Sequence, residues 1–475
     1  MQTNLYIDGN WVPSQSAQRF DVMNPATEDV IASVASADIF DADLALNAAS
    51  IAMQEWAARS PRDRSEVLRK AWELMTARLP EFARLITLEN GKANADAMGE
   101  ANYAAEFFRW FAEEAVRVDG LISHAPASGA RIIVQHKPAG IAVLVTPWNY
   151  PAAMGTRKIA PALAAGCAVI IKPASETPLT MLALMPLLEE AGVPKGVVNV
   201  LPSRNTGVLV DHMLHDPRVR VVSFTGSTEV GRKLLHSAAD QILKPAMELG
   251  GNAPAIVFED ANLDVAVEGV MLAKMRNLGE ACTAANRFYV HSSIAPAFTE
   301  KFTSAMAELK IGNGLEAGID VGPLVNSDTR NKVDAFVQDA VAKGAKVELG
   351  GVLPTGKGFF YPPTVLSGVP ETADCVGDEI FGPVAALQVF NDQEDVIRRA
   401  NDTEYGLVAY VFSEDMKRAL QVCERLDYGM VGLNRGLVSD PAAPFGGTKQ
   451  SGLGREGGHE GMHEFMETQY ISASW

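Results

Sequence analysis

Apolar residues recur every three or four positions over long stretches near the start of the chain. Between Leu44 and Gly91, charged residues fill the intervening positions, as in SEVLRKAWELMTARLPEFARLITLENG. This spacing places apolar side chains along one face of a helix. The pattern therefore predicts a mainly helical region in this part of the chain.

Short apolar runs that stop at turn residues follow between Ile141 and Phe258. They are IAVLVTPWNYP, CAVIIKPAS, VVNVLP, VRVVSFTG and AIVFED, and the segments AAMGTRKIAPALAAG and TPLTMLALMPLLEEAGVPKG have the composition of helices that end at glycine. Alternating strands and helices predict an open, doubly wound sheet, so the expected fold class is α/β. Ligands of such sheets bind at the carboxyl ends of the strands.

A second α/β series occupies the rest of the chain. A helix is expected around residues 328–344, and the strand candidates are AALQVF, GLVAYVF and GMVGLN. A short strand with polar neighbours is also expected at Ile132–Val134. The run Gly452–Gly458 predicts a turn whose backbone passes close to other chains.

The composition and the charge narrow the class of protein. A chain of 475 residues with 47% apolar and 21% charged residues is typical of a soluble enzyme with two or more domains. The net charge of -17 argues against nucleic acid or an anionic membrane as a partner. The first residues do not have the pattern of a signal peptide, and no apolar run is long enough to span a membrane, so we expect a cytoplasmic protein.

The four cysteines are far apart and form no CxxC pair, so neither a disulfide framework nor a structural zinc site is predicted. Cys282 differs from the others because the stretch GEACTAANR surrounds it with small residues that leave room for a substrate. A thiolate at this position would be a strong nucleophile. A buried cysteine that only fills the core is the alternative.

A nucleophile needs a base and a group that stabilises developing negative charge. Glu248 ends a predicted strand just before a Gly-Gly turn, where its carboxylate could point into a cleft. Asn149 follows a buried strand, and its amide could donate to an oxyanion. Taken singly, Glu248 could equally be a solvated strand-end charge and Asn149 an ordinary turn residue.

Seven motifs occur in the order and approximate spacing of the NAD(P)-dependent aldehyde dehydrogenase superfamily: TPWNYP, KPASETP, FTGSTEVG, MELGGNAP, GEACTAANR, EIFGPV and PFGGTKQSGLGRE. The chain resembles that superfamily essentially from end to end. The resemblance implies an open Rossmann-type cofactor domain (1–119 and 138–249), an α/β catalytic domain (250–440) and a small β oligomerisation arm (120–137 and 441–475). Strand pairing across subunits through this arm implies a homodimer or homotetramer.

The resemblance also implies a covalent mechanism. Cys282 would attack the aldehyde carbon, and the Asn149 amide and the Cys282 backbone N–H would hold the thiohemiacetal oxyanion. After hydride transfer, Glu248 would activate the water that hydrolyses the thioester, a role that favours a carboxylate whose pKa is raised by burial.

The cofactor-binding residues that the resemblance implies are Trp148, Lys172, Ser175, Gly226, Ser227, Leu249, Glu379 and Phe381. Lys172 and Ser175 match residues at the adenine ribose, and Glu379 matches the carboxylate at the nicotinamide ribose. A serine can accept a ribose 2′-phosphate that a glutamate would repel, and Lys172 can pair with its charge. NADP is therefore favoured and NAD is the alternative, with the neighbouring Glu176 acting against the phosphate.

The substrate-binding residues that the resemblance implies are Arg157, Arg276 and Ser439, which match the carboxylate-binding positions of the succinate-semialdehyde dehydrogenase branch. Arg435 departs from that branch and could favour a longer substrate or face solvent. Glutarate semialdehyde is therefore an alternative substrate.

The segment His459–His463 contains the HExxH pattern of zinc metallopeptidases. The glycines around it disfavour the helix that such a site needs, so no metal is expected. A thioesterase that uses Cys282 without a cofactor is a further alternative. A catalytically inactive member of the superfamily would lack Cys282 or Glu248, and both are present.

Overall fold

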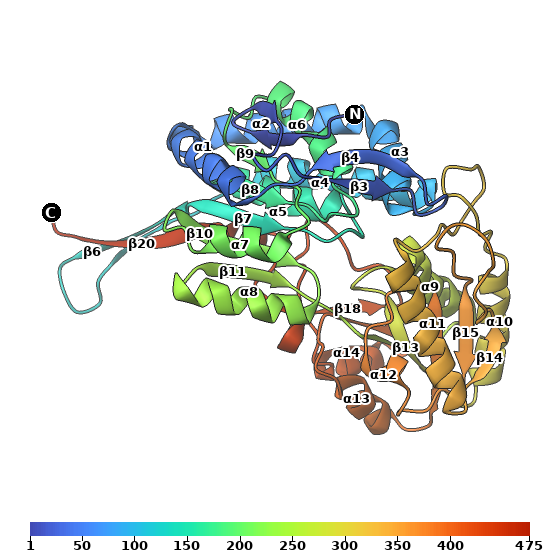
Figure 1. Cartoon of the computed structure of the whole chain (residues 1–475). Helices are drawn as coiled ribbons and strands as arrows, with labels where there is room; N and C mark the ends of the chain where they lie inside the picture. Colours follow the sequence, from blue (N-terminus) through green and yellow to red (C-terminus); the bar gives the residue numbers. More distant parts are fainter.

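The computed structural model describes residues 1–475 as two lobes with a narrow ribbon that projects from the first lobe (Figure 1). Each lobe is built on its own sheet, and the two largest apolar clusters lie one in each lobe. The predicted α/β fold class is confirmed. None of the helices combines the length and the apolar character that crossing a bilayer requires.

The first lobe contains an eight-stranded sheet. Its strands lie in the spatial order β19 (Gly452–Leu453), β11 (Lys244–Glu248), β10 (Val219–Thr225), β7 (Ile141–Val145), β8 (Ala168–Lys172), β9 (Val198–Val200), β1 (Leu5–Ile7) and β2 (Asn10–Val12). The five central strands from β11 to β9 are parallel. The chain leaves β7 toward β8 on one side and later returns to β10 on the other, so the topological switch point lies between β7 and β10.

Helices cover both faces of this sheet because its central strands are apolar on both sides. All five residues of β7 and of β8 are buried. The helices of this lobe are α1 (Ile39–Ala58), α2 (Pro61–Thr76), α3 (Leu79–Asn90), α4 (Asn94–Glu114), α5 (Ala153–Ala165), α6 (Leu179–Ala191), α7 (Thr206–Leu214) and α8 (Thr228–Asp240). α1 packs with α7 on one face, whereas α2, α4 and α5 pack together on the other. The helical region predicted near the start of the chain is therefore present as α1 to α3.

The second lobe contains a seven-stranded sheet. Its strands lie in the order β14 (Lys346–Leu349), β15 (Thr364–Ser367), β16 (Val384–Phe390), β13 (Ala285–His291), β12 (Ala253–Val257), β17 (Val408–Phe412) and β18 (Met430–Leu433). Its helices are α9 (Leu263–Met275), α10 (Ala295–Ala307), α11 (Ser327–Ala342), α12 (Asp374–Gly377), α13 (Gln393–Asn401) and α14 (Met416–Arg425). The AIVFED strand, grouped above with the first sheet, belongs here as β12, because the chain crosses between the lobes directly after β11.

The projecting ribbon is a three-stranded antiparallel sheet of β5 (Leu121–His124), β6 (Arg131–Pro138) and β20 (Met466–Ala473). The strand predicted at Ile132–Val134 is part of the longer β6. A small hairpin of β3 (Arg19–Met23) and β4 (Val30–Ala35) completes the strands. The domain bounds given above stay a prediction.

The glycine-rich run Gly452–Gly458 lies against its own chain. Gly452 and Leu453 form β19, which pairs with β11 and so covers the edge of the first sheet. A Cβ atom at Gly452 would lie 2.0 Å from the carbonyl oxygen of Met247, so only glycine allows this approach. The structure thus gives an intramolecular reason for the glycines, where an approach to other chains was predicted.

Candidate active site

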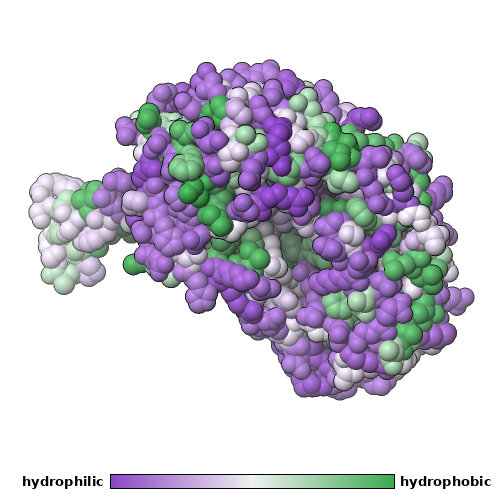
Figure 2. Space-filling model, in the orientation of Figure 1, coloured by the Kyte–Doolittle hydropathy of each residue, from purple (hydrophilic) through white to green (hydrophobic).

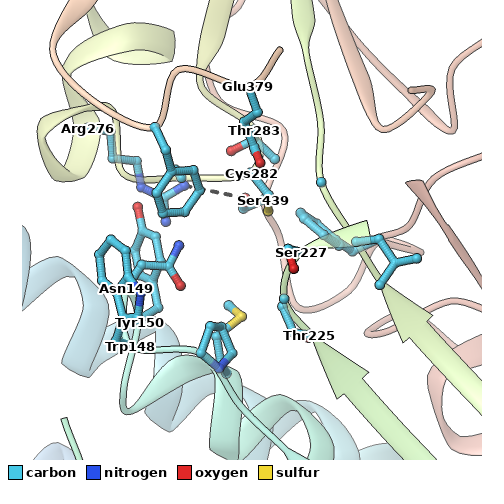
Figure 3. A pocket seen from close by; sticks show the side chains of 18 of the residues that line it. Trp148, Asn149, Tyr150, Thr225, Ser227, Arg276, Cys282, Thr283, Glu379 and Ser439 are labelled. Atoms are coloured by element: carbon cyan, nitrogen blue, oxygen red, sulfur yellow. Dashed lines mark hydrogen bonds between the residues drawn. The ribbon is translucent and has the colours of Figure 1, made fainter. Parts of the chain in front are cut away.

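A cavity of about 260 Å³ opens between the two lobes, at the carboxyl ends of β7, β10 and β11. Figure 2 shows the hollow that the two lobes form on one face of the molecule. Cys282 lies in the loop before β13 of the second lobe, and the turn after β7 brings Asn149 to the same cavity (Figure 3). The cavity therefore occupies the switch point of the first sheet, where the alternating pattern predicted a ligand.

The loop before Cys282 has an unusual backbone. Asn277 and Leu278 have φ values of 52° and 59°, and Gly279 follows with φ 75°. The Asn277 side chain donates from Nδ2 to the carbonyl oxygens of Asn149 (3.0 Å) and Glu280 (2.8 Å). Left-handed backbone at non-glycine residues persists only where the surroundings hold it. Here, one buried amide joins the cysteine loop to the asparagine turn.

The Asn149 side chain faces the cavity, and its Nδ2 donates to the carbonyl oxygen of Glu280 at 2.9 Å. An amide nitrogen has two hydrogens, so one donor is left for a ligand. The crossing from β11 to β12 passes close against the Cys282 backbone, because a Cβ atom at Gly251 would lie 2.4 Å from the Cys282 carbonyl oxygen. Thiol and amide are thus held by contacts from both lobes.

A buried ion pair contacts the turn between β7 and α5 that carries Asn149. The Lys92 ammonium lies 2.6 Å from the Glu100 carboxylate, and the two side chains are 1% and 0% exposed. Lys92 also donates to the backbone oxygen of Asn149 at 2.7 Å, and Glu100 accepts from the backbone N–H of Ala152 at 2.8 Å. These contacts fix the turn between β7 and α5.

The run Glu89-Asn90-Gly91-Lys92 was missed by sequence reasoning. Asn90 donates from Nδ2 to the carbonyl oxygen of Trp148 at 3.1 Å, and Glu89 accepts from the backbone N–H groups of two residues at the start of α6. Gly91 ends α3 with φ 95°. The sequence signal for these residues was three polar side chains around a glycine at the end of an apolar helix. Such a run is ordinarily interpreted as a solvent-exposed helix end, so it did not indicate a functional site.

The Cys282 thiol is partly exposed to the cavity but otherwise surrounded by protein. Burial, and next the negative charge of Glu379, raise the pKa of this thiol to about 12. The positive charge of Arg157 acts in the opposite direction. Cys282 is therefore a neutral thiol near pH 7 and needs a proton acceptor before it can attack.

Glu248 ends β11 as predicted and is only 3% exposed, but its side chain does not line the cavity. Its Oε1 lies beside Gly446, and its Oε2 has no hydrogen-bond partner. Burial, and next the charge of Glu456, raise the pKa of the Glu248 carboxyl well above its usual value, whereas Arg157, Lys158 and Arg455 lower it. With this raised pKa the Glu248 carboxyl can act as an acid or as a base, but its side chain would have to change conformation to reach the Cys282 thiol.

Six of the eight predicted cofactor residues line the same cavity as Cys282, namely Trp148, Gly226, Ser227, Leu249, Glu379 and Phe381. The Trp148 and Phe381 rings meet edge to face with their centroids 5.4 Å apart. Ser227 is the N-cap of α8, so the positive end of that helix faces the opening. Burial raises the pKa of Glu379 to about 7.

The other two, Lys172 and Ser175, lie beyond the cavity at the end of β8. Lys172 is 5% exposed and has no carboxylate within ion-pair distance, and burial lowers the pKa of its ammonium to about 8. A buried cation without a partner fits an anionic group of a ligand. The Ser175 hydroxyl donates to the Glu176 carboxylate at 3.2 Å, so this charge does lie at the predicted phosphate position.

The three predicted substrate residues also line the cavity. The Arg276 Nη1 donates to the Ser439 hydroxyl at 3.4 Å, a contact that is drawn in Figure 3. Arg157 is 2% exposed and approaches from α5. Arg435 does not line this cavity; it is exposed, and its Nε donates to the carbonyl oxygen of Leu437 at 2.8 Å.

The HExxH pattern does not form a long helix, since α15 covers only Glu460–His463. His459 pairs through Nδ1 with Glu114 at 2.8 Å, and its Nε2 lies 3.1 Å from that of His463. No group of three or more histidine, cysteine or acidic side chains is arranged to hold a metal ion.

A family model described as "Aldehyde dehydrogenase family" matches residues 11–471. The chain belongs to the aldehyde dehydrogenase family. It is 53% identical to a succinate-semialdehyde dehydrogenase of Paenarthrobacter nicotinovorans, over 93% of this chain and 98% of the relative. It is 47% identical to a glutarate-semialdehyde dehydrogenase of Pseudomonas aeruginosa, over 98% of this chain and 96% of the relative.

Solved structures agree with this assignment. A crystal structure described as an E. coli NADP dependent enzyme superimposes with a TM-score of 0.98 at 44% identity, covering 100% of this chain and 98% of that one. The predicted superfamily and the predicted enzyme class are thereby confirmed: the protein is an aldehyde dehydrogenase, an oxidoreductase that uses NAD(P).

The high pKa of Cys282 predicts how this aldehyde dehydrogenase reacts with an alkylating agent in the absence of cofactor. Below the pKa, the thiolate fraction rises about tenfold for each pH unit, so the rate of Cys282 alkylation by iodoacetamide should keep rising from pH 7 to pH 10. Peptide mass spectrometry at timed intervals measures this rate for Cys282 alone. A rate that levels off below pH 9 would show that the thiol is already ionised.

The buried ion pair under the asparagine turn predicts a stability difference between two lysine variants. Lys92→Met leaves the Glu100 carboxylate buried without a cation, which should lower the free energy of unfolding by about 3–5 kcal/mol. Lys233→Met breaks an exposed pair with Glu229 that water screens, so it should lower the free energy of unfolding far less. Urea unfolding at one protein concentration compares them, and equal losses would contradict the structural role of Lys92.

Proposed function

We propose that this aldehyde dehydrogenase oxidises an aldehyde whose far end carries a carboxylate, with succinate semialdehyde as the first candidate. The observation that carries the proposal is that two arginines, Arg157 and Arg276, line the same small cavity as the Cys282 thiol. Arginine suits a planar carboxylate in a partly dry site. The cations also supply local positive charge in a protein whose net charge is -17.

In this proposal, Cys282 gives its proton to a water molecule in the cavity, and its sulfur forms a bond to the aldehyde carbon. The carbonyl oxygen becomes an oxyanion that accepts from the free Asn149 N–H and from the Cys282 backbone N–H. Bound NAD(P) supplies the hydride acceptor. The residues that would hold it are those that follow β7, β10 and β11 in the cavity, together with Glu379 and with Lys172 at the end of β8. Collapse of the oxyanion leaves a thioester on Cys282.

Glu248 then acts as the general base for thioester hydrolysis. Its carboxylate turns from its place beside Gly446 toward the thioester and takes a proton from the attacking water. A raised pKa suits this role, because a carboxylate at its ordinary pKa is a weak base near neutral pH. Glu248 passes this proton to the departing sulfur, so the carboxylic acid product leaves and the Cys282 thiol is restored.

For the cofactor we propose NADP ahead of NAD. The Lys172 ammonium, which has no carboxylate partner, supports binding of a ribose 2′-phosphate, and a solved relative is described as NADP dependent. The Glu176 carboxylate on Ser175 opposes the phosphate, so the preference should be modest. Calorimetric titration with NADPH and with NADH measures it directly, and tighter binding of NADH would contradict the proposal.

Glutarate semialdehyde is the second candidate substrate, supported by the Pseudomonas aeruginosa relative that is named for it. It differs from succinate semialdehyde by one methylene between the aldehyde and the carboxylate. A pocket discriminates one methylene by only about 1–3 kcal/mol. Steady-state kinetics with both compounds would rank them.

We also propose that the three-stranded sheet is an oligomerisation arm. Leu121, Ile122 and Tyr470 are 54%, 73% and 59% exposed on it, and β5 and β20 are both edge strands. Exposed apolar edges of this kind are usually covered by another chain. Sedimentation equilibrium tests this, since a monomer would contradict it. The cytoplasmic location stays a prediction.

The covalent mechanism predicts different consequences for the two catalytic side chains. Glu248→Gln should still form about one NADPH per subunit in a first turnover, while its steady-state rate falls by roughly 100-fold or more because hydrolysis loses its base. Cys282→Ala should form no NADPH in either phase. Stopped-flow absorbance separates the phases. Loss of the first turnover in Glu248→Gln with bound cofactor would refute the assigned order of steps.

The carboxylate clamp predicts a substrate-dependent effect of one arginine. Arg276→Ala should raise the KM for succinate semialdehyde by about tenfold or more, because a charged hydrogen-bond pair is lost, and leave the KM for butanal within about twofold. Arg435→Ala is the matched control, since that arginine is exposed outside the cavity. Equal effects of Arg276→Ala on both aldehydes would remove the clamp from the proposal.

A further inference from the structure

The Arg157 guanidinium is buried with its hydrogen-bonding capacity largely unused. Its Cζ lies 4.1 Å from the centroid of the Phe445 ring, and its Nη1 has only the Met154 sulfur, at 3.8 Å, as an acceptor. The Nε and Nη2 groups have no acceptor with hydrogen-bond geometry. Nε faces the Glu456 carboxylate, so the unused donors of this cavity-lining arginine are those on its two Nη groups.

Glu456 balances the charge of this guanidinium. Its Oε2 lies 2.6 Å from the Arg157 Nε in an ion pair, and its other oxygen contacts the Lys158 ammonium. Glu456 is 5% exposed and Lys158 is fully buried, so all three charges are shielded from water. Lys158 is held a second time by the Ser223 hydroxyl on β10, at 2.9 Å.

The carboxylate and the aromatic ring that touch Arg157 belong to one backbone unit. Phe445 and Glu456 pair antiparallel, with N–H···O distances of 2.7 and 2.8 Å in the two directions. The ring therefore covers one face of the guanidinium while the carboxylate holds its edge. An arginine side chain has several rotatable bonds, and fixing them before a ligand arrives removes an entropic penalty from binding.

We propose that Glu456 is a positioning residue that holds the Arg157 guanidinium with its free N–H groups toward the cavity, and thereby favours aldehydes that carry a carboxylate. This inference rests on the proposed function, since it explains how one arm of the carboxylate clamp is oriented. Glu456 acts through Arg157 and does not touch the substrate.

Glu456 also acts on the general base Glu248. The charged groups that act on Glu248 are Glu456, Arg157, Lys158 and Arg455. Glu456 forms ion pairs with both neighbouring cations, Arg157 and Lys158. If its charge is removed, both cations act on Glu248 without compensation, which lowers the pKa of that carboxyl. A change at Glu456 should therefore alter substrate preference and the pH dependence of the reaction together.

The central variant is Glu456→Gln, which keeps the size of the side chain and removes its charge. We expect the KM for succinate semialdehyde to rise about tenfold and the KM for butanal to stay within about twofold. The matched control is Glu464→Gln, a half-buried carboxylate on the same segment whose Oε1 accepts from the Arg455 backbone at 3.2 Å. An equal rise for both aldehydes would overturn the inference.

A double-mutant cycle tests whether Glu456 acts through Arg157. In an Arg157→Met background, Glu456→Gln should change the KM for succinate semialdehyde by less than about twofold, because the residue that it positions is gone. Additive effects of the two substitutions would overturn the inference. If Arg157→Met alone leaves the preference for succinate semialdehyde intact, Arg157 is not part of the proposed clamp. If Arg157→Met removes this preference while Glu456→Gln has no effect, the clamp stands and only the positioning role of Glu456 fails.

Arg157→Lys tests the same inference without changing Glu456, and remains decisive if Glu456→Gln does not fold. Lysine keeps the charge but has one nitrogen, which cannot serve both the Glu456 carboxylate and a substrate. We expect a KM for succinate semialdehyde as high as that of Arg157→Met, and a wild-type KM would overturn the inference. The pH dependence gives a further test. In Glu456→Gln, the apparent pKa of the acidic limb of the pH–rate profile should fall, because the Glu248 carboxyl loses a neighbouring negative charge. An unchanged or higher apparent pKa would count against the inference.

Discussion

Ionic side chains that are shielded from water surround the Cys282 cavity, and each needs compensation inside the protein. An isolated buried charge is very unfavourable, and pairing a cation with a carboxylate offsets much of that cost. Lys92 with Glu100 meets this requirement below the Asn149 turn, and Glu456 meets it for Arg157 and Lys158. The positions of the Asn149 turn and of Arg157 depend on these pairs.

The pairs also join segments that are distant in the sequence. Lys92 at the end of α3 contacts the turn after β7, and Glu456 near the end of the chain contacts α5. The second lobe enters the same network through Asn277, which donates to Asn149. A cavity between two lobes would otherwise vary in shape with their relative motion. Here, buried polar contacts cross the junction and fix the geometry that a nucleophile and an oxyanion donor require.

Much of the architecture was predictable because it depends on local patterns. Apolar runs such as Ile141–Val145 identify strands that are buried on both faces, and residues at the ends of such strands, such as Asn149 and Glu248, are natural site candidates. The ordered motifs identified the superfamily. The alternation of strands and helices wrongly grouped the AIVFED strand with the first sheet, because apolar strands on both sides of the crossing look alike; only the domain bound at residue 250, which the superfamily motifs imply, separates it from that sheet.

The supporting residues could not be found in this way. Glu456 lies in a glycine-rich run that predicts only a turn, and its role depends on pairing with Phe445 and on α5, far away in the sequence. Lys92 looks like a solvated charge after a helix end, yet it is 2% exposed. Long-range pairing of charges is a property of the assembled lobes and leaves no periodic signal in the chain.

The central claim is that the substrate becomes covalently attached to Cys282. The most direct measurement is mass spectrometry of peptides from the Glu248→Gln variant, quenched in acid shortly after mixing with succinate semialdehyde and NADP. We expect one succinyl group on the peptide that contains Cys282 and none on the peptides of Cys167, Cys375 and Cys423. NADPH formation without acylation of Cys282, or with acylation of another residue, would contradict it.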